Sequence, residues 1–220
     1  MDKTEEEMAR GCYGYGSWEA PYWFIGLEQG KGRNEAADNT PRINAWNQLG
    51  ADELCDCAKF HRLISEKRWH DEARLQPTWR PLILLLMSYL GRSTDNEVLR
   101  TYQSKQWGKI GGETCVIELS GLAAKGLHTP MDRDSFRSER IDVIGKRLRT
   151  HTPELVVMYG GGQTGKKHWE AIAASALKQD EASKLSSQPT VIVLAKHPLA
   201  RGLGNDYWEE LGEKAKRLTK

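Results

Sequence analysis

The sequence predicts an α/β protein of three layers (α/β/α), in which helices cover both faces of a central four-stranded parallel sheet. Short apolar runs typical of strands alternate along the chain with longer segments whose apolar residues recur at the helical period. This alternation favours parallel strands joined by right-handed crossovers. Because 220 residues suit one well-packed core and no linker rich in Pro, Gly or Ser divides them, we expect a single domain spanning residues 1–220.

Four apolar runs are predicted to form the strands. The first is an aromatic and β-branched run that starts at Tyr22 and leads into residues 26–30, Gly-Leu-Glu-Gln-Gly. The others are residues 114–119, 155–159 and 190–195. The run at 114–119 is apolar up to the acid Glu118 near its end, as expected of a strand that is covered by helices on both faces.

Helical segments separate these strands. A polar loop at 31–42 is followed by a long helical region, whose apolar face ends near Ile64. The next helices are predicted from Thr78 to Leu90 and from a capping box at 94–97 to about Gly108. Three further helices carry apolar residues at the helical spacing, and they lie at about 135–150, after the glycines at 160–162, and at the C-terminus.

Charge is nearly balanced, with a formal net charge of +2, but basic residues gather in clusters. Those at strand exits, near 166–168 and 196–201, are candidates for contacts with a phosphate backbone. Those at 133–149 fit the solvated face of an amphipathic helix. The polar, acidic N-terminus and the shortness of the longest apolar run lead us to expect a cytoplasmic protein with no membrane partner. The four cysteines lack metal-site spacing and are expected to be reduced, packed thiols.

Glu28 is the first candidate for catalysis. It follows the first strand, and ligands of open α/β sheets bind beyond the carboxyl ends of the strands. The flanking Gly26 and Gly30 allow a tight turn and a close backbone approach. A solvated loop glutamate after an ordinary core strand is the alternative interpretation of this segment alone.

Residues 160–167, Gly-Gly-Gly-Gln-Thr-Gly-Lys-Lys, fit the phosphate-binding pattern G-x-x-x-x-G-K, follow a strand and open a helix. A P-loop has a Ser or Thr after its lysine to hold magnesium, and Lys167 cannot do so. No later strand ends in an Asp that would complete the metal site, since the fourth leads into Lys196. We therefore expect this glycine turn, with Lys166, to bind a phosphate of a larger polyanion at the helix N-terminus.

The fourth strand leads into residues 196–202, Lys-His-Pro-Leu-Ala-Arg-Gly. Together with the segment 26–30 and the four-strand pattern, this turn resembles the uracil-DNA glycosylase superfamily, in which short motifs follow the first and last strands. The resemblance covers most of the chain, from Pro21 to Trp208. It implies a monofunctional DNA glycosylase that flips a pyrimidine out of the duplex, cleaves its N-glycosidic bond and leaves an abasic site. We expect DNA as the partner, a monomer, and no metal or organic cofactor.

The resemblance implies roles for individual residues. Glu28 matches the residue that positions or activates water, and as a carboxylate it also stabilises positive charge on the sugar. His197 matches a histidine that donates a hydrogen bond to the pyrimidine O2 as negative charge develops there. Arg201 matches the wedge that fills the gap left by the flipped base, with Leu203 as the alternative. The residues expected to contact the DNA backbone are Gly161, Gly162, Lys166 and Lys196.

The chain departs from strict uracil enzymes at the base pocket. Gly30 stands where those enzymes have a Tyr that blocks bases substituted at C5, which implies an open pocket. Glu118 lies on the strand that supplies their uracil-binding Asn, and a carboxylate accepts a hydrogen bond from the cytosine amino group but not from uracil O4. Gln29 replaces a Pro in the first loop. Trp46 is the candidate for stacking on the base.

These departures favour excision of a C5-modified pyrimidine, with a modified cytosine such as phage genomes carry preferred to plain uracil, and a role in defence against such phage. Three alternatives stay open: a uracil-excising repair enzyme, a nucleotide-binding phosphotransferase built on residues 160–167, and a non-catalytic nucleic-acid-binding module. For Glu118 the alternative is a structural role, as a cap of the next turn. The spacing of the cysteines does not support the iron–sulfur cluster that some relatives hold.

Overall fold

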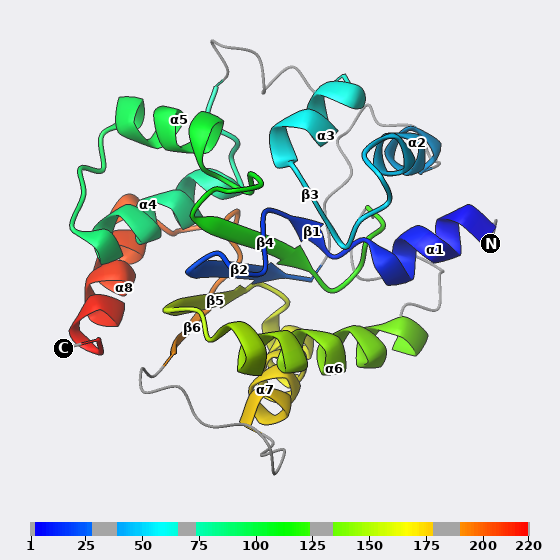
Figure 1. Cartoon of the computed structure of the whole chain (residues 1–220). Coiled ribbons are helices and arrows are strands. Elements are labelled where there is room, and N and C mark those ends of the chain that lie inside the picture. The colour runs from blue at the N-terminus through cyan, green and yellow to red at the C-terminus, as the bar shows by residue number, and fades with distance from the viewer. Residues whose placement is uncertain (1–2, 28–38, 66–73, 124–133, 178–189, 220) are drawn as a thin grey trace.

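The computed structural model describes residues 3–27, 39–65, 74–123, 134–177 and 190–219, and it has the predicted α/β class (Figure 1). In this part of the chain the strands form one mixed sheet of six, in the order β3-β1-β4-β2-β5-β6. The strands are β1 (Gly14–Tyr15), β2 (Tyr22–Gly26), β3 (Leu54–Cys55), β4 (Thr114–Glu118), β5 (Leu155–Tyr159) and β6 (Val191–Ala195). None of the described helices is long and apolar enough to cross a membrane.

The four predicted strands are β2, β4, β5 and β6, and they lie side by side in the order β4-β2-β5-β6 with every pair parallel. The prediction of a four-stranded, purely parallel sheet is nevertheless wrong, because β1 and β3 extend the sheet beyond β4. β1 runs antiparallel to β4 and parallel to β3. Each of these two strands has only two residues, too few for any period to appear in the sequence.

Eight helices surround the sheet in the described residues: α1 (Lys3–Gly11), α2 (Thr40–Gln48), α3 (Cys57–Leu63), α4 (Trp79–Leu90), α5 (Asn96–Lys105), α6 (Asp134–His151), α7 (Gly162–Leu177) and α8 (Asn205–Arg217). The long helical region predicted after residue 42 is instead divided into α2, β3 and α3. Gly50 and Ala51 have positive φ and reverse the chain after α2. Asp56 then begins α3, where its side chain accepts a hydrogen bond from the Lys59 N–H (3.0 Å).

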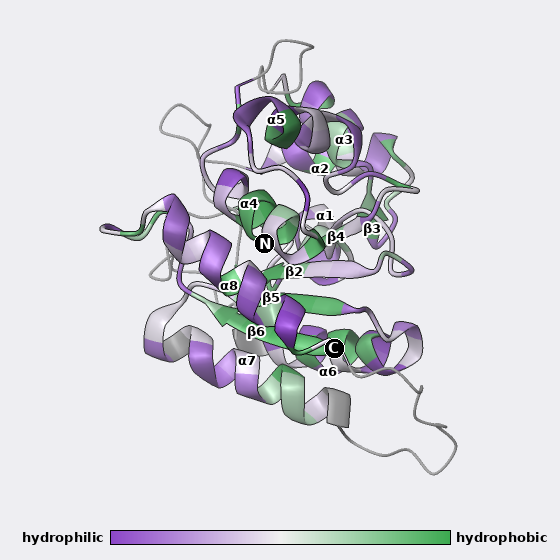
Figure 2. Cartoon of the chain, turned by 90° about the vertical axis from the view of Figure 1, so that its left-hand side faces the viewer, coloured by the Kyte–Doolittle hydropathy of each residue, from purple (hydrophilic) through white to green (hydrophobic). Residues whose placement is uncertain are grey.

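Helices pack on both faces of the sheet, so the predicted three layers are present (Figures 1 and 2). Along β2, Tyr22 and Phe24 belong to the core shared with α4 and α8, whereas Trp23 and Ile25 belong to the core shared with α6 and α7. We call these the α4 face and the α6 face of the sheet. β2, β4 and β5 are buried along their whole length, which explains why their sequences are apolar without alternation.

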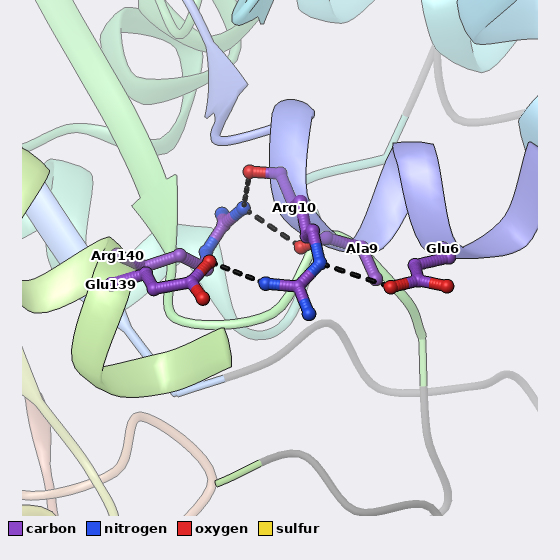
Figure 3. A network of polar contacts seen from close by, with 5 residues as sticks. All are labelled: Glu6, Ala9, Arg10, Glu139 and Arg140. Atoms are coloured by element: carbon purple, nitrogen blue, oxygen red, sulfur yellow. Dashed lines mark hydrogen bonds and ion pairs between the residues drawn. The ribbon is translucent and has the colours of Figure 1, made fainter. Parts of the chain in front are cut away.

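Arg140 of α6 joins three elements of the fold from a fully buried position, with 1% of its surface exposed (Figure 3). Its guanidinium lies over the Tyr13 ring, 4.0 Å from the ring centroid. It donates hydrogen bonds to the carbonyl oxygens of Ala9 (3.0 Å), Arg10 (3.1 Å), Cys12 (2.9 Å) and Glu118 (2.6 Å). One side chain thus ties the end of α1 to the end of β4. Burial lowers the pKa of Arg140, and the four carbonyl groups offset the cost of removing its charge from water.

Replacing Arg140 by Met is expected to lower the free energy of unfolding by about 3 kcal/mol or more, because four carbonyl groups, those of Ala9, Cys12 and Glu118 in buried hydrogen bonds, lose a charged donor. Urea unfolding of the purified variant measures the change. The matched control is Arg10→Met, since Arg10 forms ion pairs with Glu6 and Glu139 at the surface. It should change stability far less than Arg140→Met does, and equal losses in the two variants would contradict the structural role given to Arg140.

Candidate active site at the carboxyl edge of the sheet

The carboxyl ends of the four parallel strands define one edge of the sheet. In register, Gly26 at the end of β2 lies beside Glu118 at the end of β4, and Tyr159 at the end of β5 lies beside Ala195 at the end of β6. The chain leaves these strands through the segments that the sequence singled out. These segments therefore leave the sheet on the same side of the molecule.

The glycine turn after β5 touches both of its neighbours at this edge. Gly160 and Gly161 have positive φ, and neither has room for a side chain. A Cβ atom on Gly160 would lie 3.0 Å from Cδ2 of His197, and one on Gly161 would lie 2.5 Å from Cδ1 of Leu27. The turn is thus packed between the residue that precedes Glu28 and the ring of His197. Segments from three different strands meet at this point.

The structure describes only the first two residues of the motif at 26–30. Leu27, which is buried, is the last residue described before residue 39. Glu28, Gln29 and Gly30 lie outside the described residues. What the structure gives is the point at which the chain enters this segment, next to the glycine turn.

His197 is held in one tautomer by its own turn. The backbone N–H of Leu199 donates to Nδ1 of the ring (3.1 Å), so Nδ1 is an acceptor and the ring proton of the neutral form lies on Nε2. The Ala200 N–H donates to the His197 carbonyl oxygen (2.8 Å) and closes the turn. Partial burial of the ring, against Gly160, lowers the pKa of His197. At neutral pH this side chain is a neutral hydrogen-bond donor.

Two aromatic residues that the sequence analysis did not select hold these turns in place. The indole N–H of Trp169, on α7, donates to the carbonyl oxygen of Gly160 (3.2 Å). The Tyr207 hydroxyl, on α8, accepts a hydrogen bond from the backbone N–H of Lys196 (3.2 Å), and the Lys196 ammonium lies 5.9 Å from the same ring. Both residues occupy helical core positions in the sequence, so no signal separated them from ordinary packing residues.

The two candidate wedge residues differ in their surroundings. Arg201 is exposed, whereas Leu203 is partly buried against the α4-face core. Leu203 therefore shares its surface between the core and the solvent, and its assignment as an alternative wedge stays a prediction. Leu199, at the tip of the turn, is 57% exposed.

Helix α7 begins at Gly162, two residues after Gly160, which lies against the ring of His197. Helix geometry leaves the first N–H groups of α7 without an intrahelical acceptor, so they are available to an anion. Lys166 and Lys167 are exposed on the same helix, and the Lys166 ammonium lies 3.7 Å from the Glu170 carboxylate. The Gly165 N–H already bonds the Gly161 carbonyl oxygen (2.8 Å), so residues that would form the phosphate-wrapping loop of a P-loop are helical here.

Glu118 and Tyr159 meet across Gly26. The Tyr159 hydroxyl donates to Oε1 of Glu118 (3.2 Å), and a Cβ atom on Gly26 would lie 2.4 Å from Glu118 Oε2 and 2.6 Å from the Tyr159 hydroxyl. Glu118 and Tyr159 are 6% and 4% exposed. Tyr159 escaped the sequence analysis because a tyrosine inside a buried strand is most often a core residue.

Trp46 does not belong to this site. It is 6% exposed, packs against Gly11 of α1, and its indole N–H donates to the Asp52 carbonyl oxygen (2.8 Å). No face of the ring is open to a base, so its prediction as a stacking residue is corrected. Its place at helical spacing on an amphipathic segment fits the core position that it occupies.

The four cysteines are buried free thiols, as predicted. Burial raises the pKa of Cys57 and Cys115 well above that of a free thiol, which makes both unreactive. Among the described residues no three His, Cys, Asp or Glu side chains gather in a way that would hold a metal ion.

Comparison of the chain with models of known families, with characterised proteins and with solved structures finds no match. The geometry of the carboxyl edge is therefore the basis for a functional proposal.

Gly26→Ala is expected to lower the free energy of unfolding by about 1–3 kcal/mol. The new methyl group must push apart the buried side chains of Glu118 and Tyr159, which are hydrogen-bonded to each other. Urea unfolding measures the loss. Gly204→Ala is the control, since a Cβ atom there meets nothing within 4 Å and only the weaker preference of Ala for the start of α8 opposes it. The site geometry predicts a clearly larger loss for Gly26→Ala, and the reverse order would contradict it.

Proposed function

We propose that this protein is a monofunctional DNA glycosylase, which hydrolyses the N-glycosidic bond of a flipped-out pyrimidine nucleotide and leaves an abasic site. One observation carries the proposal. The glycine turn after β5 contacts both Leu27, which precedes Glu28, and the ring of His197. Leu27, from the motif after the first strand, and His197, from the motif after the last strand, therefore contact the same glycine turn, and these are the two motifs that carry the resemblance to the uracil-DNA glycosylase superfamily.

The chemistry needs groups of opposite character on the two sides of the bond. As the bond from C1′ to the base breaks, positive charge develops on the sugar and negative charge on the base. In the proposed mechanism Glu28 stabilises the sugar cation and orients the water that attacks C1′. The Nε2–H of His197 donates to O2 of the departing pyrimidine anion. A donor of this kind lowers the barrier by about 3 kcal/mol.

The surroundings of the edge suit a DNA backbone. The start of α7, with Gly161 and Gly162, offers N–H groups to a phosphate, and Lys166 and Lys196 add exposed positive charge on either side of the turn. Arg201 is exposed beyond His197 and is our candidate for the side chain that fills the gap in the duplex. Extracting a paired base costs a few kcal/mol, which such contacts must offset.

The favoured substrate is a pyrimidine substituted at C5, and a modified cytosine rather than uracil. Gly30 implies room beside C5, and Glu118 supplies an acceptor for the exocyclic amino group at C4. A protein with this preference would suit defence against phage whose DNA carries modified cytosines, and that role is part of the proposal.

Glu28→Gln keeps the size of the side chain and removes its charge. We expect base release to fall at least about 100-fold while the Kd for DNA stays unchanged, because the carboxylate acts on the transition state rather than on bound DNA. The assay uses single-stranded and duplex oligonucleotides that contain a C5-modified cytosine, uracil or a mismatched thymine, and it scores abasic sites by alkaline cleavage. Glu210→Gln, at an exposed position of α8, is the matched control.

Other outcomes of that assay separate the alternatives. Release of uracil alone would keep the enzyme class and overturn the substrate. Binding of DNA by the unmodified protein without release of any base would favour a non-catalytic module. Thermal stabilisation by magnesium-ATP would favour the phosphotransferase, since a ligand that binds only the folded state raises its stability.

The lowered pKa of His197 predicts the pH below which the rate of base release falls. The folded chain takes up a proton on His197 at lower pH than the unfolded chain does. The neutral ring therefore contributes its full stability above the unfolded pKa of about 6.5, and this contribution is lost as the pH falls through the pKa of the folded chain. Protonation of Nδ1 would also place a donor against the Leu199 N–H. We expect base release to persist below pH 6.5 and to decline only when the ring titrates.

NMR titration of the imidazole, assigned with His197→Gln, measures this pKa directly, and the pH–rate profile is compared with it. A midpoint at or above that of a free histidine would contradict the lowered pKa.

A further inference from the structure

The pair formed by Glu118 and Tyr159 spans three neighbouring strands. Glu118 ends β4, Tyr159 ends β5, and Gly26 of β2 lies between them. Because Gly26 has no side chain, the Tyr159 hydroxyl reaches Oε1 of Glu118 at 3.2 Å directly above the backbone of β2. The geometry therefore brings a phenol and a carboxylate together beside the end of β2, one residue before Leu27.

In the hydrogen bond between Tyr159 and Glu118 the tyrosine hydroxyl is the donor. Burial, with the nearby Glu118 carboxylate, raises the pKa of Tyr159 well above that of a free tyrosine, so the hydroxyl keeps its proton and donates it. A donor aimed at a carboxyl oxygen favours the ionised form of that carboxyl. The guanidinium of Arg140 reaches the backbone carbonyl oxygen of the same Glu118 (2.6 Å) and adds positive charge nearby.

The charge of Glu118 decides which bases it can recognise. An ionised carboxylate only accepts hydrogen bonds, so it suits the 4-amino group of a cytosine. A protonated carboxyl also donates, so it suits the 4-oxo group of a uracil or thymine. A carboxylate has about four acceptor sites, so it can accept several hydrogen bonds at once.

We infer that Tyr159 is a positioning residue for base selection: it holds Glu118 ionised and in one orientation, and so makes the site prefer pyrimidines with a 4-amino group. This inference rests on the proposed glycosylase function. It adds that the Tyr159 hydroxyl, on β5, determines whether the Glu118 carboxyl, on β4, accepts or donates a hydrogen bond.

The test compares two substrates that differ only at C4. Duplexes carry either 5-hydroxymethylcytosine or 5-hydroxymethyluracil at one position, and kcat/KM is measured for each with the unmodified protein, with Tyr159→Phe and with Tyr22→Phe. The first variant removes only the hydroxyl that bonds Glu118. Tyr22 is a buried tyrosine at the opposite end of β2 and serves as the matched control.

We expect the unmodified protein and Tyr22→Phe to prefer the cytosine, and the preference to fall at least about 10-fold in Tyr159→Phe. A merely structural role would lower both rates together and leave their ratio unchanged, and this outcome would overturn the inference while the glycosylase proposal stood. If the unmodified protein released neither base nor any other, the proposed function itself would fail.

A second measurement keeps the inference testable if Tyr159→Phe folds poorly. Carbon NMR of the unmodified protein, labelled in its glutamate carboxyl groups and assigned with Glu118→Gln, shows whether Glu118 is ionised at pH 7. An ionised carboxyl supports the inference. A protonated one overturns it whatever the activity.

Discussion

Burial of the central strands on both faces is the constraint on which the rest of the structure depends. β2, β4 and β5 have helices against both of their surfaces, so most of their side chains are apolar and their backbone groups must pair within the sheet. Polar groups are thereby concentrated at the strand ends, as Glu118 and Tyr159 are, and in the residues that follow them. Because the strands are parallel, those residues gather at one edge, and Arg140 fixes one end of that edge by joining β4 to α1 and α6.

The parts of the fold that could be predicted are those whose pattern is long enough to repeat. The apolar strands and the helices with a regular apolar face are of this kind. β1 and β3 could not be predicted, because two-residue strands are defined only by partners far away in the sequence, as Tyr15 is by Cys55 and Val116. The break between α2 and α3 was hidden for another reason: the apolar residues of β3 and α3 happen to continue a helical spacing across it.

The residues of the candidate site likewise fall into those that the sequence could indicate and those that it could not. The sequence indicated the strand ends, because a charged residue after an apolar run is visible in one dimension. Tyr159 stayed hidden, since its importance comes from a carboxylate 41 residues away. Trp46 was misassigned because sequence shows the type of a side chain but not which side of it is covered. The structure shows that Trp46 lies inside the core.

The crowded space above Gly26 also has a meaning for evolution. Three strands contribute to one small volume, which holds the ends of two side chains because the third residue has none. A relative that gains a side chain at this position must displace the carboxylate and the phenol, and only one that has lost both side chains is free of the clash. Gly26, Glu118 and Tyr159 should therefore change together in descent, as a single inherited character shared by segments that are distant in the chain.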